Sequence, residues 1–203
     1  MARNYNTEIT DAIKTFLDED DWHYNFENEN GVFRFGVALH GKMKNIQLLV
    51  GVNEDDYNVY AISPLSADQD DPEQMRQMAE FICRANYGLR DGNFEMDFND
   101  GELRYKCFVN CKGFIPTKDV IGASIHCPAA MFNRYSKGII QILFNDMSAE
   151  DAVLLCEEYL APPSSCSSNG DEASTELINI LRRLQEEETN GDSEDDFSIT
   201  SAK

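Results

Sequence analysis

Residues 71–110 read DPEQMRQMAEFICRANYGLRDGNFEMDFNDGELRYKCFVN, and this stretch predicts a helix that is followed directly by a β-hairpin. Asp71 suits the N-cap position and Pro72 suits the first helical position. Asp100 and Gly101 mark the turn of the hairpin, because they lie between two runs of alternating apolar and polar residues. The rest of the chain is expected to pack around this unit.

One face of the predicted helix is built for burial, since apolar residues recur at steps of three and four. They are Met75, Met78, Ala79, Ile82 and Cys83. Gln74 is placed to complete a capping box, and Gly88 is placed to end the helix in a Schellman motif. The apolar face of the hairpin is predicted to consist of Phe94, Met96, Phe98, Leu103, Tyr105, Cys107, Val109 and Cys111.

A family resemblance lies in the same stretch. The run RANYGL at residues 84–89, the GNFEMD segment from Gly92 and the DGELRYK segment from Asp100 resemble the YbjN family, whose fold is similar to that of type III secretion chaperones. The resemblance extends more loosely from Thr7 to Leu160. It implies a bacterial α+β domain, often dimeric, with a role in regulation or chaperoning and no established enzymatic activity. It supplies no catalytic residues.

The remaining sequence predicts a two-layer α+β domain over residues 1–160. Every clear strand has one apolar and one polar face, which indicates an antiparallel sheet with helices packed on one face. A strand over residues 57–62 is expected to end before Pro64, and a helix from Thr117 to Asn145 is expected to restart or kink at Pro128. Further elements are a first helix from Asn6 or Thr7, strands near residues 22–27, 33–39 and 46–52, and a last helix capped by Ser148 and Asp151.

Residues 161–203 form a largely disordered acidic tail by composition. Within it, residues 172–188 predict a short amphipathic helix whose apolar stripe is a candidate partner-binding surface. The stripe contains Leu177, Leu181 and Leu184. Either this helix docks on its own domain or on a partner, or it stays a nascent helix without a binding role.

Composition excludes several classes of partner. A chain of 203 residues with a net charge of −20 is not expected to bind nucleic acid or an anionic membrane. No signal peptide or membrane span is predicted, so we expect a cytoplasmic protein. The six cysteines are expected to be free, reduced thiols without bound metal.

The sequence gives little support for a metal site or a catalytic site. Cys107 and Cys111 share one strand face but lie too far apart for one ion, and His126 with Cys127 lacks a second short-spaced ligand pair. His23 and the similarly placed His40 are interpreted as solvated, so neither a cofactor nor a catalytic residue is predicted. A thiol-dependent enzyme remains the catalytic alternative, with Cys107 and Cys111 beside lysines.

Three basic side chains, Arg34, Arg104 and Lys106, are predicted on the polar strand face. If their strands are neighbours, they form a positive patch for a carboxylate or an acidic peptide. The alternative is pairing with acidic residues of adjacent strands. The favoured function is a non-catalytic protein-binding module, chaperone-like or regulatory and homodimeric, that binds a protein or peptide. A small-ligand sensor is the alternative.

Overall fold

The computed structural model describes residues 4–157, and this part of the chain contains one six-stranded sheet and four helices. The strand order is β1-β2-β3-β4-β6-β5, with every neighbouring pair antiparallel. The strands are β1 (Asn25–Glu27), β2 (Val32–Ala38), β3 (Asn45–Val52), β4 (Asp56–Ser66), β5 (Asn93–Met96) and β6 (Glu102–Asn110).

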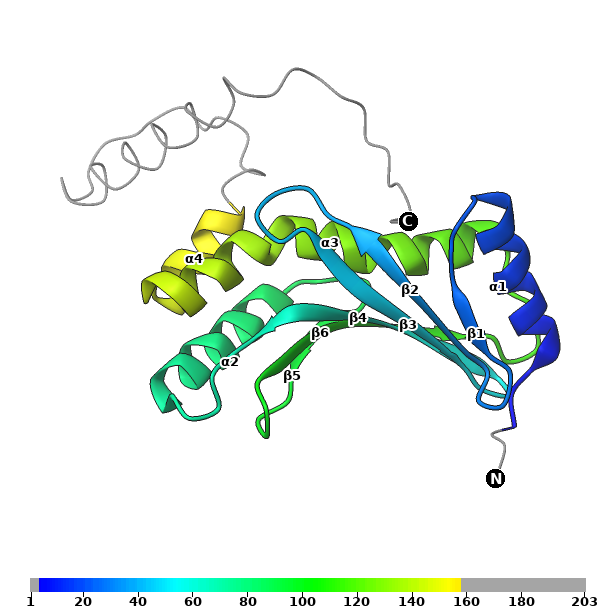
Figure 1. The fold of residues 1–203 in the computed structure, drawn as a ribbon, viewed down its shortest axis with the longest axis horizontal. Helices are drawn as coiled ribbons and strands as arrows, with labels where there is room; N and C mark the ends of the chain where they lie inside the picture. Colours follow the sequence, from blue (N-terminus) through cyan, green and yellow to red (C-terminus); the bar gives the residue numbers. More distant parts are fainter. Residues whose placement is uncertain (1–3, 158–203) are drawn as a thin grey trace, which may run out of the picture. The chain divides into compact units, whose positions relative to one another are not determined.

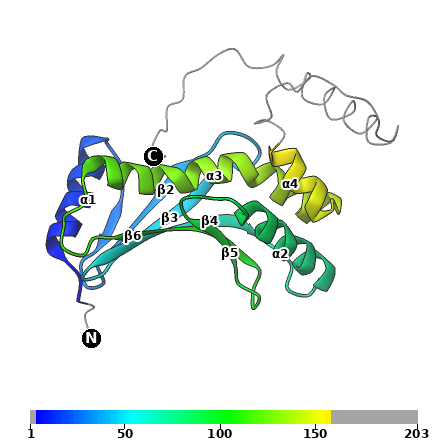
Figure 2. The same ribbon diagram turned by 180° about the vertical axis from the view of Figure 1, so that it is seen from behind.

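The helices cover one face of this sheet, as predicted for an α+β fold (Figure 1). They are α1 (Thr7–Glu19), α2 (Pro72–Asn86), α3 (Lys118–Asn145) and α4 (Ala149–Glu157). Helix α3 packs on β4 and β6, while α2 packs on β5, α3 and α4. The view from behind shows α2 next to the β5–β6 hairpin (Figure 2).

Buried and more exposed residues alternate along the strands, which gives the sheet one inner and one outer face. The inner residues of β3 and β4 are fully buried, whereas Gln47 of β3 is exposed and Tyr60 of β4 is half-buried on the outer face. Phe33, Tyr57, Tyr105, Phe132 and Tyr135 are among the largest side chains of the core. The antiparallel sheet with one covered face is therefore confirmed.

Helix α2 begins as predicted but ends differently. Asp71 accepts hydrogen bonds from the amides of Glu73 and Gln74 at 3.0 and 3.1 Å. The predicted capping box is wrong, because the Gln74 side chain accepts from the Asp68 amide instead. The Schellman motif is also wrong. The Leu89 amide donates to the Asn86 carbonyl, which closes a type II turn with Gly88 at φ +87°.

Two prolines are tolerated where the sequence predicted a boundary. Strand β4 continues through Pro64. Its register with β6 shifts between Ile62 and Ser66, so the backbone N–H that proline lacks is not needed for a hydrogen bond between these strands. Helix α3 is continuous through Pro128, which is buried on its packed side. Burial of the flanking turns against the sheet stabilises α3 across the lost hydrogen bond.

The helix predicted over 117–145 carries more apolar residues than one sheet face is expected to cover, which favours a second subunit. Most of them are covered within one chain, since Ile121, Ile125, Phe132, Ile139 and Ile142 are at most 2% exposed, while Val120 and Phe144 near the helix ends are 37% and 65% exposed. The homodimer thus stays a prediction that follows from the family resemblance. None of the helices in residues 4–157 is both long and apolar enough to cross a bilayer.

The predictions for the C-terminal tail fall outside the described residues. These are the disordered segment over 161–203, the helix at 172–188 and its stripe of Leu177, Leu181 and Leu184.

Candidate functional site

The predicted basic patch is divided by the sheet topology. Arg34 lies on β2, whereas Arg104 and Lys106 lie on β6, and strands β3 and β4 separate the two. The condition for a single patch, that these strands be neighbours, is therefore not met. Sequence alone could not show this, because the hairpin containing β6 joins the sheet after a helical crossover.

Each basic residue instead meets an acidic residue of an adjacent strand. Arg34 Nε lies 2.6 Å from Glu27 Oε1, and this hydrogen bond lowers the pKa of Glu27. Arg104 Nε lies 2.7 Å from Glu95 Oε2, and Lys106 Nζ lies 3.8 Å from Glu95 Oε1. Exposed pairs of this kind contribute little to stability, but they fix the positions of the side chains.

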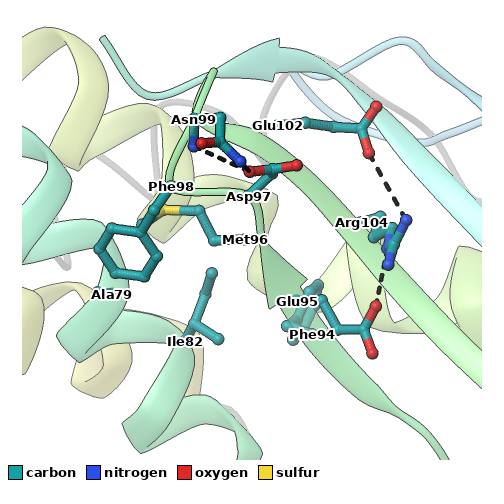
Figure 3. A pocket seen from close by; sticks show the side chains of 10 residues that line it. All are labelled: Ala79, Ile82, Phe94, Glu95, Met96, Asp97, Phe98, Asn99, Glu102 and Arg104. Carbon is teal, nitrogen blue, oxygen red and sulfur yellow. Dashed lines mark hydrogen bonds and ion pairs between the residues drawn. The ribbon is translucent and has the colours of Figure 1, made fainter. Parts of the chain in front are cut away.

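A groove lies between α2 and the β5–β6 hairpin, with a volume of about 660 Å³. We name it the β5 groove. It is lined by Ala79, Ile82, Phe94, Glu95, Met96, Asp97, Phe98, Asn99, Glu102 and Arg104. Figure 3 shows Met96 and Phe98 beside Ala79 and Ile82, with Arg104 between Glu95 and Glu102.

Phe98 is the most unusual member of the groove, because its side chain is 68% exposed. It had been predicted on the buried face with Phe94 and Met96, but β5 ends at Met96 and Phe98 lies in the turn that follows. The turn is fixed by the Gly101 amide, which donates to the Asp97 carbonyl at 2.8 Å. The signal available in the sequence is an aromatic residue inside the polar turn run Asp97 to Gly101.

Strand β5 forms one edge of the sheet, and Asn86 covers part of that edge. The Phe94 amide donates to Asn86 Oδ1 at 2.8 Å, and Asn86 Nδ2 donates to the Phe94 carbonyl at 2.9 Å. One side chain therefore satisfies both outward backbone groups of Phe94, as a neighbouring strand would. This explains the asparagine of the RANYGL run.

Two residues after Phe94, the N–H and C=O groups of Met96 point to the same outward side. Along an edge strand, the backbone groups of successive residues point alternately toward the neighbouring strand and away from it. The next residue turns back toward β6, where the Asp97 amide donates to the Glu102 carbonyl at 3.0 Å. Among the hydrogen bonds of the described residues, none occupies the outward groups of Met96. The β5 groove therefore contains an edge position open to another strand.

The polar rim of the groove is mainly acidic. Glu95, Asp97 and Glu102 surround the single cation Arg104, which is within 4.0 Å of Glu102. Hydrogen bonds from the amide and side chain of Asn99 lower the pKa of Asp97, so this carboxylate is ionised at neutral pH. The groove thus combines an apolar wall with net negative charge.

The cysteines and histidines considered for catalysis lie apart from the groove. Burial raises the pKa of Cys111 to about 11, and the pKa of Cys107 is raised as well. His126 packs between the rings of Phe16 and Trp22, and burial lowers its pKa. Among residues 4–157, no group of three or more candidate ligands could hold a metal ion.

Tyr87 has the side chain of the RANYGL run that faces solvent most fully. Tyr87 follows α2 with a side chain that is 92% exposed, so it contributes little to packing. Its position between Asn86 and Gly88 places it on the turn that leads toward β5.

Comparison with protein families gives one match, and comparison with curated protein sequences gives none. The match is YbjN, described as a putative bacterial sensory transduction regulator, and it covers residues 10–141. That range includes most of α1, all six strands, α2 and most of α3, and therefore the whole β5 groove. The chain belongs to the YbjN family.

Proposed function

We propose that this YbjN family member is a non-catalytic regulatory module that binds an extended segment of a protein partner in the β5 groove. The observation that supports this most strongly is Phe98, a large apolar side chain that is 68% exposed beside an open strand edge. Exposed aromatic residues next to a groove are typical of protein-binding sites.

Backbone pairing is the first part of the recognition. An incoming strand accepts a hydrogen bond from the Met96 amide and donates one to the Met96 carbonyl, as in other cases of strand addition. The Asn86 side chain already bonds the outward amide and carbonyl of Phe94, so the added strand extends from Met96 toward the turn. Pairing of this kind fixes the direction of the segment and leaves its side chains to provide specificity.

Side-chain chemistry is the second part. An apolar residue of the partner packs against Ala79, Ile82 and Phe98, which removes the Phe98 ring from water. A neighbouring basic residue faces Glu95, Asp97 or Glu102 at the rim. The net charge of −20 also speeds the approach of a basic segment. The expected ligand is therefore an extended apolar and basic peptide.

This assignment corresponds to chaperone-like or regulatory binding rather than to an enzyme, and it agrees with the regulatory description of the family. A fold similar to that of type III secretion chaperones is part of the proposal. A small-ligand sensor is the less favoured function, since the β5 groove is open along the hairpin, a shape that suits an extended chain better than an enclosed ligand.

Peptide selection on the full-length protein tests the proposal. A phage-displayed library is expected to enrich apolar and basic peptides without proline at the pairing positions. Phe98→Asp should lower the affinity for the selected peptide by about 30-fold, which corresponds to a loss of roughly 2 kcal/mol of binding free energy at an aromatic anchor. Fluorescence anisotropy of the labelled peptide measures the change.

The chain offers matched controls. Phe144 of α3 is 65% exposed and Phe108 on the outer sheet face is 57% exposed, and neither lines the groove. Phe144→Asp and Phe108→Asp should therefore leave the affinity unchanged. Loss of binding in either control with retention in Phe98→Asp would assign the peptide to another surface.

The homodimer is a separate part of the proposal. Light scattering of the full-length protein at micromolar concentration should give the mass of two chains. A monomer mass under these conditions would remove the dimer from the proposal and leave the peptide groove unaffected, because every groove residue comes from one chain.

A further inference from the structure

Two cysteines that are distant in the sequence meet beneath the segment between α2 and β5. Cys107 lies on β6 and is buried, while Cys127 lies on α3 and is half-buried. Both sulfurs lie against the Asp91–Gly92 peptide, because Cys127 Sγ is 3.8 Å from the Asp91 carbonyl oxygen and a Cβ on Gly92 would lie 3.0 Å from Cys107 Sγ. The other described cysteines do not share this arrangement.

Polar groups surround the exposed member of the pair. The Cys127 thiol lies 3.8 Å from the Asp91 carbonyl oxygen and 4.0 Å from the Tyr105 hydroxyl oxygen. Tyr105 also donates a hydrogen bond to the Asp91 carbonyl. Hydrogen bonding from Cys107, and to a lesser degree from Tyr105, lowers the pKa of Cys127, whereas burial raises the pKa of Cys156 to about 11.

We propose that Cys107 and Cys127 form a reversible intramolecular disulfide when the protein meets a hydroperoxide. The geometry supports this pairing because both sulfurs converge on the Asp91–Gly92 peptide, with one thiol half-buried and reachable by a small oxidant and the other buried. The inference does not depend on peptide binding in the β5 groove.

The chemistry proceeds in two steps. The Cys127 thiolate attacks one oxygen of the hydroperoxide, the O–O bond breaks, and Cys127 becomes a sulfenic acid while hydroxide or alkoxide leaves. The Cys107 thiol then attacks the sulfenic sulfur while its proton passes to the departing hydroxide, so the S–O bond breaks, the S–S bond forms and water leaves. Together the two thiols lose two electrons, and the hydroperoxide gains them.

Oxidation changes the contacts of the segment between α2 and β5. A Cys127 sulfur held in a disulfide no longer donates to the Asp91 carbonyl, which leaves that carbonyl with Tyr105 alone. Gly92 packs against the other sulfur of the pair, since a Cβ placed there would lie 3.0 Å from Cys107 Sγ. We therefore expect amide exchange of residues 87–92 to change on oxidation.

Peptide mapping after peroxide treatment tests the inference. Full-length protein carrying Cys83→Ser and Cys166→Ser is reduced, exposed to hydrogen peroxide near equimolar concentration, alkylated and digested. The expected product links the Cys107 and Cys127 peptides with loss of two hydrogens and is reversed by dithiothreitol. Cys111 and Cys156, whose thiols are buried, should be alkylated only after denaturation.

Single variants separate the two roles. In Cys107→Ala the sulfenic acid at Cys127 should persist and be trapped by dimedone, whereas in Cys127→Ala neither label nor disulfide should form. Thermal melts verify that both variants fold, and Cys107→Ser or Cys127→Ser replaces the alanine variant at the same position if that variant does not fold. Two results would overturn the proposal. One is dimedone labelling of Cys127, without a disulfide, in protein that retains both Cys107 and Cys127; the other is a disulfide that joins either of them to Cys111 or Cys156.

Discussion

The two edge strands of the sheet are both short, but their surroundings differ. At the β1 edge, the Phe26 ring lies 6.2 Å from the Tyr5 ring and 4.3 Å below the ammonium of Lys14. At the β5 edge, Asn86 covers Phe94 only, Met96 is open on its outward side, and Phe98 is 68% exposed.

This difference indicates a division of roles within one sheet. Short edge strands discourage unwanted pairing wherever they occur. Aromatic cover at β1 adds apolar burial and removes a binding surface, whereas the β5 edge keeps apolar area exposed at a cost in stability. We interpret the β1 edge as structural and the β5 edge as the binding edge.

The largest expected effect compares a glycine at each edge. Gly92 has φ +74°, and a Cβ there would lie 2.5 Å from the backbone carbonyl oxygen of Lys106, which cannot move away. Gly92→Ala should therefore lower the free energy of unfolding by about 3–5 kcal/mol, or roughly 10 °C in Tm. Circular dichroism melts measure the change.

Gly31 near β1 is the matched position, with φ +66° and a Cβ distance of 2.5 Å to the Tyr5 ring. The ring can swing outward, but Tyr5 Cβ at 2.9 Å moves only with its own backbone, so Gly31→Ala should cost about 2–3 kcal/mol, still less than Gly92→Ala. Equal losses at the two glycines would contradict the view that only the β1 edge is covered by a movable side chain.

A smaller effect is expected from Asn86→Ala, which removes both hydrogen bonds to Phe94. The loss should be about 2 kcal/mol, equivalent to roughly 4–8 °C in Tm, because two backbone groups lose their partner. Tyr87→Ala at the next, 92% exposed, position is the control and should change Tm by less than 2 °C. An unchanged Tm in Asn86→Ala would show that the β5 edge does not need the two hydrogen bonds from this side chain.

His126, on the side of the molecule near α1, gives a pH-dependent effect. Burial lowers its pKa below the ordinary 6.5, so the unfolded chain binds more protons in the window below that value. The stability that neutral His126 contributes is present above pH 6.5 and is lost as the pH falls through the folded-state pKa.

The variant His126→Phe removes this titration and fits between the rings of Phe16 and Trp22. Its Tm should fall less than that of the unsubstituted protein between pH 7.5 and 5. His23→Gln, at an exposed position, serves as the comparison variant. Parallel Tm profiles for the unsubstituted protein and His126→Phe would contradict the burial argument.

The smallest effect should come from Lys14→Ala at the β1 edge. Loss of the cation over the Phe26 ring is expected to cost about 0.5–1 kcal/mol, since the site is partly exposed. Urea denaturation resolves a change of this size, and Lys42→Ala provides a comparison at an exposed loop lysine. A loss above that of Asn86→Ala would reverse the expected order of the edges.

Local patterns predicted most of the fold. Alternation identified the strands, and Asp71 and Thr117 identified helix starts through their capping side chains. These features depend on neighbours within a few residues, which the sequence shows directly.

Features that depend on distant contacts were not predictable in the same way. The separation of Arg34 from Arg104 follows from strand order, and the continuation of α3 through Pro128 follows from packing on the sheet. The β5 groove also needs the tertiary pairing of Asn86 with Phe94. Cys83 was placed on the buried face of α2, but the structure exposes it because Phe81 and Ala85 face the core.

Amide exchange at Met96 tests the central claim most directly. Full-length protein is saturated with a peptide selected as described above, and exchange is followed residue by residue by NMR. We expect marked slowing at the Met96 amide and no further change at the Phe94 amide, which already donates to Asn86 Oδ1. At the same peptide concentration, the slowing at Met96 should be clearly smaller in Phe98→Asp. Slowing confined to β1 or to the outer sheet face around Phe108, with Met96 unchanged, would contradict the assignment of β5 as the binding edge.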